Sequence, residues 1–259
     1  MQEENNQTEV QNTSSQPVAT VSQPSSTLMK DLLIPISIVI AGIAVGAGMY
    51  FGGAPAKGSD VPVAQPEKVA DNTSKINPIT DKDHVKGNRN AEIKIVEYSD
   101  FDCPFCSRFH DTMKVVAEKY GDDIAWVYRQ FPLEQLHPQA PAVAMASECV
   151  AELGGDDAFW IFTDGYFAAR GAGDKTAHAE LIGKLVTESG VNTAAFTECF
   201  DSGRQLSKVQ ADMDNAVETG GRGTPWSILI GPSGKTYPIN GALPQQTIEQ
   251  VIELAKKEA

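Results

Sequence analysis

The spacing of hydrophobic and polar residues changes sharply near residue 100. From Ile93 to Tyr98 the residues alternate as in a β-strand, whereas apolar residues from Pro104 to Tyr120 recur at helical spacing. Proline suits the first position of a helix, where its missing N–H costs nothing. The pattern therefore predicts a strand, a short loop and an amphipathic helix, with Cys103 at the N-terminus of that helix.

The rest of the C-terminal region predicts an α/β fold. A second strand is expected at Ile124–Phe131, followed by helical patterning over residues 135–219. Within this block the breaks, most of which contain glycine, separate five expected helices: 142–153, 158–169, 177–188, 193–200 and 204–218. Strands at Trp226–Ile230 and Thr236–Ile239 and a helix over 244–257 complete the order.

The N-terminal third has a different character. Residues 1–31 are mostly small and polar, which predicts a disordered tail. Leu32–Phe51 is uncharged and mostly apolar, and about 20 helical residues span the roughly 30 Å of a bilayer core. We expect a single transmembrane anchor there, the alternative being a buried core helix. Residues 52–80 predict a flexible linker, and 81–259 the folded domain.

The sequence signals for cleavage of the anchor and for its orientation in the membrane are weaker. Ala54-Pro55-Ala56 has the form of a signal-peptidase site, but the long apolar run and the poorly basic segment before it favour an uncleaved anchor. The few flanking lysines do not set an orientation. A spare pair of cysteines suits an oxidising compartment, so we expect a single-pass protein of the cell membrane with an extracytoplasmic domain.

Charge and cysteine content narrow the function. The net charge of −13, without a basic stripe, argues against nucleic-acid binding. The four cysteines, Cys103, Cys106, Cys149 and Cys199, are too few for a disulfide scaffold and suggest one redox pair plus two others.

The Cys103-x-x-Cys106 pair at a strand–helix junction indicates thiol–disulfide exchange. The N–H groups and dipole at a helix N-terminus favour a thiolate, the reactive form of cysteine. Cys103 is thus the expected nucleophile, and Cys106, one turn further on, the resolving cysteine. An alternative from a different class is a non-enzymatic metal-binding domain that uses Cys103, Cys106 and His110.

These residues resemble the DsbA-type thiol oxidoreductases of the thioredoxin superfamily. The resemblance covers roughly His84 to the C-terminus and rests on EYSDFDCPFC, on GTPW at 223–226 and on the order of elements. It implies a thioredoxin-like fold with a helical insertion. It further implies that Glu97 is a buried acid that relays protons and that the Thr224–Pro225 bond is cis, opposite the cysteines, where Thr224 presents backbone to a substrate peptide.

The resemblance also suggests a substrate surface and a second disulfide. Pro104, Phe105 and Trp226 would contact substrate, and Phe101 would join them unless some of these aromatic residues cover core instead. Cys149 and Cys199 would form a structural disulfide, the alternative being two buried free thiols.

One departure from the family concerns the residue before the second cysteine. Strongly oxidising members have histidine there, whereas this chain has Phe105. We therefore expect a less depressed pKa for Cys103 and a less oxidising pair, which leaves reductase or isomerase activity open. The expected partners are reduced or unfolded exported proteins and a membrane redox partner, with no cofactor.

Overall fold

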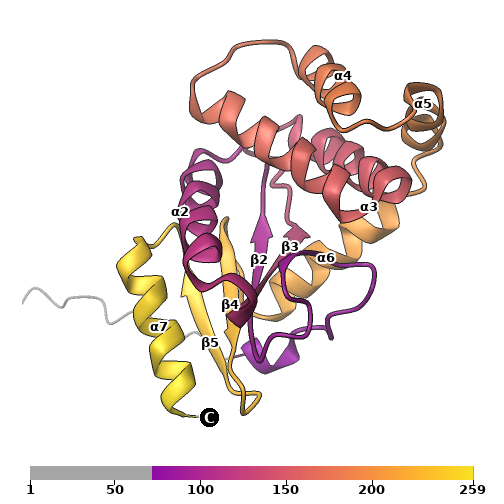
Figure 1. The fold of residues 1–259 in the computed structure, drawn as a ribbon. Helices are drawn as coiled ribbons and strands as arrows, with labels where there is room; N and C mark the ends of the chain where they lie inside the picture. The colour runs from indigo at the N-terminus through magenta and orange to yellow at the C-terminus, as the bar shows by residue number, and fades with distance from the viewer. Residues whose placement is uncertain (1–71, 259) are drawn as a thin grey trace, which may run out of the picture. The chain divides into compact units, whose positions relative to one another are not determined.

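A mixed five-stranded sheet forms the centre of the computed structural model, which describes residues 72–258 (Figure 1). The strand order is β1-β3-β2-β4-β5, and β2 pairs with β3 in parallel while the other neighbours are antiparallel. The strands are β1 His84–Gly87, β2 Ile93–Ser99, β3 Ile124–Gln130, β4 Trp226–Ile230 and β5 Thr236–Asn240.

The predicted tail, the transmembrane anchor at Leu32–Phe51 and the linker up to residue 71 lie outside the described residues. Within residues 72–258, no helix combines the length and the apolar character needed to cross a bilayer.

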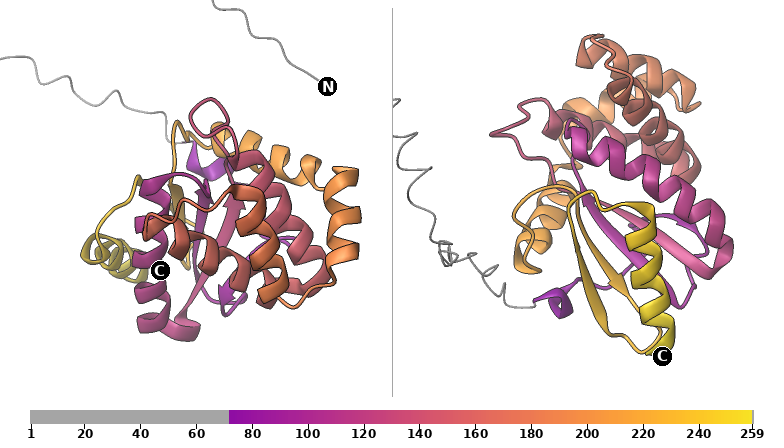
Figure 2. Two further views of the ribbon diagram at one scale, coloured as in Figure 1. Left: turned by 90° about the horizontal axis from the view of Figure 1, so that it is seen from above. Right: turned by 90° about the vertical axis from the view of Figure 1, so that its left-hand side faces the viewer.

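The two central strands, β2 and β3, are buried on both faces because helices cover the sheet on each side. Ile95 and Trp126 face one core cluster, whereas Val96 and Val127 face the other. Helices α2 (Pro104–Tyr120) and α7 (Gln245–Lys257) lie side by side on the first face, and α6 (Leu206–Glu218) covers the second (Figures 1 and 2). The thioredoxin-like α/β layering predicted from the sequence is confirmed.

The predicted helical insertion is also confirmed between β3 and β4. It contains α3 (Ala140–Gly171), α4 (His178–Glu188), α5 (Thr193–Ser202) and α6. The helices expected at 142–153 and 158–169 correspond to the two parts of α3, which are separated by a kink at Gly155. Gly155 has a φ of 69°, a positive value that glycine adopts without steric cost, and its backbone is not helical.

Two further features differ from the expectation. Ile93–Tyr98 is not the first strand, because β1 precedes it and pairs with β3. Part of the predicted linker is also packed: the backbone N–H of Asn77 donates to Asn215 Oδ1 at 2.9 Å, and Arg129 Nη2 donates to the carbonyl oxygen of Asn77 at 3.1 Å. Ordered structure therefore begins before residue 81, the boundary predicted from composition.

A disulfide joins Cys149 on α3 to Cys199 on α5, 50 residues further along the chain. Both cysteines are fully buried. The bond ties the first half of α3 to a short helix of only ten residues, which could bury little surface alone.

Replacing both cysteines, Cys149→Ala and Cys199→Ala, is expected to lower the free energy of unfolding by about 2–4 kcal/mol, because a closed loop of this length restricts the unfolded chain. Urea denaturation of both proteins under non-reducing conditions measures the change. A loss of less than about 0.5 kcal/mol would show that the bridge does not hold the insertion together.

Candidate active site

The junction between β2 and α2 places Cys103 at the N-cap of α2, immediately before Pro104. Asp100 shapes this loop: its backbone oxygen accepts from Cys103 N at 3.1 Å, and its Oδ1 accepts from Asp102 N at 2.8 Å. The first turn of α2 therefore begins at a fixed point, with its free N–H groups next to the sulfur of Cys103.

The loop before β4 lies opposite Cys103. The Thr224–Pro225 peptide bond is cis, and Cys103 Sγ donates to the carbonyl oxygen of Thr224 at 3.5 Å. Two segments more than 100 residues apart in the sequence thus meet at the nucleophilic sulfur. Pro104 and Phe105 are exposed beside this meeting point, with Phe105 53% exposed.

The two cysteines of the motif lie in different environments. Hydrogen bonds from the Cys106 thiol and from the N–H groups of Cys106 and Phe105, with a contribution from Thr224, outweigh burial and lower the pKa of Cys103 to about 5. Cys106 is fully buried, and burial with the nearby charges of Cys103 and Glu97 raises its pKa well above the usual 9.0. Cys103 is thus the sulfur that ionises first.

The low pKa of Cys103 modifies the expectation drawn from Phe105. The sequence argument relied mainly on the N–H groups at the helix end, because Phe105 cannot stabilise a thiolate. The strongest contribution instead comes from the Cys106 thiol. This interaction is available to any pair one helical turn apart, so the residue between the cysteines is not required for it.

Glu97 lies beneath Cys106 on β2 and is fully buried. Its Oε2 accepts a hydrogen bond from Trp126 Nε1 at 2.9 Å, while its Oε1 has no hydrogen-bond partner among residues 72–258. Burial raises the pKa of Glu97 to about 7, against weaker opposing contributions from nearby Ser99 and from the hydrogen bond of Trp126. A carboxyl group with this pKa can both accept and release a proton near neutral pH.

Two histidines far away in the sequence bind the acidic residues of the active-site loop. His137, in the loop after β3, places Nδ1 2.9 Å from Asp100 Oδ2, and His178 places Nε2 3.1 Å from each carboxylate oxygen of Asp102. No pattern of residues along the chain singled out either histidine. The only sequence signal is the aspartate on each side of Phe101, which indicates that this loop needs hydrogen-bond partners.

The charge of Cys103 also affects the pKa of His137. Partial burial acts to lower its pKa, but the hydrogen bond and charge of Asp100, with smaller contributions from Cys103 and Asp102, raise it above the usual 6.5. In the pH range where Cys103 ionises, His137 therefore carries a positive charge. It supplies from another element a charge that Phe105 cannot provide.

Of the aromatic residues predicted to form a surface around the cysteines, only Phe105 is exposed. Phe101 is 1% exposed and packs against Tyr128, Phe162, Tyr166 and Phe167. Trp226 is 5% exposed, faces the α6 side of the sheet and donates from Nε1 to Thr219 Oγ1 at 3.0 Å. The strand register turns the Trp226 ring into the core, as in the alternative that some of these aromatic residues cover core, so little of the ring is exposed for the predicted substrate contact.

His110, the third residue of the alternative metal site, is directed elsewhere. Its ring is 1% exposed and packs against Trp126 and Phe167, and its Nε2 lies 2.7 Å from Asp164 Oδ1. In the part of the chain that the structure describes, no three side chains of His, Cys, Asp or Glu gather as metal ligands would.

A thioredoxin-like sheet, a Cys-x-x-Cys pair at a helix N-terminus and a facing cis-proline together define a thioredoxin-fold dithiol protein. A family model described as Thioredoxin matches residues 79–253, and the chain belongs to this family.

Solved structures extend the likeness to the helical insertion. DsbA2 of Pseudomonas aeruginosa is 24% identical with a TM-score of 0.55, and the match covers 67% of this chain and 94% of that one. The alpha-DsbA1 of Wolbachia pipientis is 21% identical with a TM-score of 0.60, covering 72% of this chain and 96% of that one. At these identities the likeness concerns the fold, which is of the DsbA type.

A curated relative found by sequence is named as an antiporter and not as a DsbA protein. The Na(+)/H(+) antiporter NhaA of Herminiimonas arsenicoxydans is 30% identical over 193 residues, or 74% of this chain. The match covers only 29% of the length of that protein.

Replacing the buried acid, Glu97→Gln, should remove a pH-dependent destabilisation of the reduced protein. Because the pKa rises from 4.5 in the unfolded chain to about 7 in the fold, ionisation opposes folding, and stability falls as the pH rises from about 4.5 to about 7. The difference corresponds to about 3 kcal/mol. Urea denaturation at pH 4 and pH 8 measures it, and equal pH dependence in both proteins would contradict it.

Replacing the second histidine partner, His137→Gln, is expected to raise the pKa of Cys103 by less than about one unit, because a positive charge near the thiolate is lost. The pH dependence of alkylation by neutral iodoacetamide measures this pKa. His178→Gln, which removes the other imidazole, is the comparison variant. An unchanged pKa in His137→Gln would show that its charge does not reach the sulfur.

Proposed function

We propose that the chain is a protein thiol–disulfide oxidoreductase that acts on exported proteins through Cys103 and Cys106. The observation that carries this proposal is the asymmetry of the pair: Cys103 has a pKa of about 5, whereas that of Cys106, one turn into the helix, is raised well above 9.0. A thiol of low pKa is a good leaving group in disulfide exchange. This favours disulfide donation over reduction or isomerisation.

The proposed cycle begins when a substrate thiolate attacks Cys103 Sγ in the Cys103–Cys106 disulfide. A bond forms between the substrate sulfur and Cys103, the bond to Cys106 breaks, and Cys106 leaves as a thiolate that takes a proton from Glu97. A second substrate thiolate then attacks the substrate sulfur, and Cys103 leaves as a thiolate. The substrate loses two electrons and the cysteine pair gains them.

The cis-proline loop is the proposed docking point for substrate. Backbone next to Thr224 and Pro225 lies against Cys103, and an extended peptide could pair with it as an added strand. Exposed Pro104 and Phe105 would contact the same peptide. The proposed role of Pro225 is to hold this backbone in place and keep other ligands away from the sulfur.

We further propose that the domain works outside the cytoplasm and is anchored by Leu32–Phe51. The apolar run supports the anchor, and the Cys149–Cys199 disulfide suits an oxidising compartment. A membrane redox partner would then accept the electrons. We do not extend sodium–proton exchange to this chain, because the match covers 29% of the antiporter named for it.

The proposal is tested with the full-length chain in detergent and reduced peptide substrates. Cys103→Ser should abolish exchange. Cys106→Ala is instead mixed with a peptide that carries a disulfide: the Cys103 thiolate attacks this disulfide, one peptide thiolate leaves, and the mixed disulfide should accumulate because the resolving thiol is gone. The matched control is the Cys149→Ala, Cys199→Ala variant, which should retain exchange. Substantial exchange by Cys103→Ser would overturn the proposal.

Titration of the Cys103–Cys106 pair against glutathione buffers determines the direction of electron flow. A reduction potential nearer to about −120 mV, the range of strong oxidants, is expected because the Cys103 thiolate is stabilised. A value near about −270 mV, the thioredoxin range, would assign the chain to the reductases instead.

A further inference from the structure

A cavity of about 450 Å³ opens beside Cys103, between the first turn of α2 and the end of α3 with the loop that follows it. Its charged lining comprises Arg108 from α2, Arg170 from α3, Lys175 from the loop, and the carboxylates of Asp102 and Asp174. Three cations and two carboxylates thus surround the space next to the proposed nucleophile. Which of these charged groups could attract a ligand depends on whether each one already has a partner within the fold.

Both carboxylates already form hydrogen bonds with other residues of the fold. Asp102 accepts from Tyr166 Oη at 2.7 Å and lies 3.1 Å from His178 Nε2. Asp174 Oδ1 accepts from the backbone N–H of Thr176 at 2.8 Å and from its hydroxyl at 2.7 Å. These hydrogen bonds, with a smaller contribution from the charge of Arg170, lower the pKa of Asp174.

None of the three cations, in contrast, lies within ion-pair distance of a carboxylate among residues 72–258. Arg170 Nη1 donates to the carbonyl oxygens of Asp174 and Thr176 at 2.9 and 3.0 Å, but its Nη2 is buried without an acceptor in the described chain. The guanidinium of Arg108 lies 4.6 Å from the centre of the Phe105 ring. Neither Arg108 nor Lys175 forms an ion pair with any residue from 72 to 258. Positive charge therefore remains available next to Cys103.

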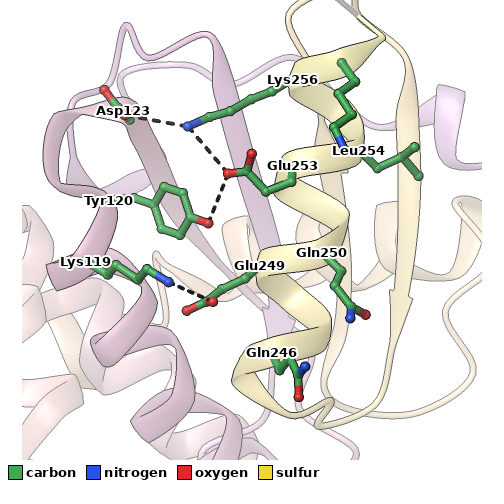
Figure 3. A pocket seen from close by; sticks show the side chains of 10 residues that line it. Lys119, Tyr120, Asp123, Gln246, Glu249, Gln250, Glu253, Leu254 and Lys256 are labelled. Atoms are coloured by element: carbon green, nitrogen blue, oxygen red, sulfur yellow. Dashed lines mark hydrogen bonds and ion pairs between the residues drawn. The ribbon is translucent and has the colours of Figure 1, made fainter.

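A second hollow, at the other end of α2, shows the opposite arrangement (Figure 3). There Lys119 lies 2.8 Å from Glu249 across the gap to α7, and Lys256 lies 3.7 Å from Asp123. These two lysines are paired with carboxylates within the fold, unlike Arg108 and Lys175 at the cysteine end. The chain as a whole has a net charge of −13.

From this geometry we propose that the cavity binds an acidic side chain of the polypeptide substrate, next to the substrate's reactive cysteine. The inference rests on the proposed function and names its substrate class: exported proteins whose cysteine is flanked by Asp or Glu. Arg108 and Lys175 would pair with the carboxylate, and the charge of Arg170 and the N-terminus of α2 add to the positive potential.

The test measures the rate at which the oxidised full-length chain reacts with three reduced peptides that differ only beside the cysteine, which is flanked by Glu, Gln or Lys. Neighbouring charges also change the reactivity of the peptide thiol itself, so each rate is divided by that with the neutral reagent 2,2′-dithiodipyridine. The normalised rate is expected to be about tenfold higher for the Glu than for the Lys peptide at low ionic strength, and the ratio should shrink in 0.5 M salt by about half or more.

The double variant Arg108→Gln, Lys175→Gln should bring this ratio close to one. The matched control, Lys114→Gln with Lys257→Gln, removes two exposed lysines that do not line the cavity and should keep the ratio. Equal normalised rates in the unmodified chain, or a ratio that survives in the cavity variant, would overturn the inference while the exchange reaction stands. No reaction with any peptide would overturn the proposed function and this inference with it.

Discussion

The position at which α2 begins is the constraint on which the rest of the site depends. With Cys103 at the N-cap and Cys106 one turn inside, one sulfur meets the free N–H groups of the helix and the other is enclosed by the sheet. A thiolate at Cys103 is then stabilised by hydrogen bonds, while ionisation of Cys106 is opposed by burial. The same two side chains thereby take different chemical roles.

Glu97 is buried beneath the cysteine pair, and its role also follows from this burial. The sheet register puts Glu97 opposite Tyr128 and Ser227, and water is excluded from all three side chains. Because solvation is lost and only one strong donor, Trp126, is provided, the carboxyl group holds its proton to near neutral pH. A buried acid of this kind costs stability when it ionises, which is a cost consistent with a role in proton transfer.

The helical insertion contributes to the site as well as to the core. The end of α3 and the start of α4 supply Tyr166 and His178, which hold Asp102, and the same region supplies Arg170 and Lys175 beside Cys103. The loop before the insertion supplies His137, which holds Asp100. The active-site loop is thus fixed by residues from the insertion side, which also places charged side chains beside Cys103.

The sequence by itself determined the elements whose signals are local: the strand–helix change of period at Cys103, the helical block and the strands around Trp226 and Thr236. It missed β1, since four residues including Lys86 and Gly87 carry no readable period and only pairing with β3 makes them a strand. Tertiary structure alone decided that Trp226 faces inward and that His137 and His178 meet the active-site aspartates. Such contacts depend on register and on distances across the fold, which residue spacing along one chain does not encode.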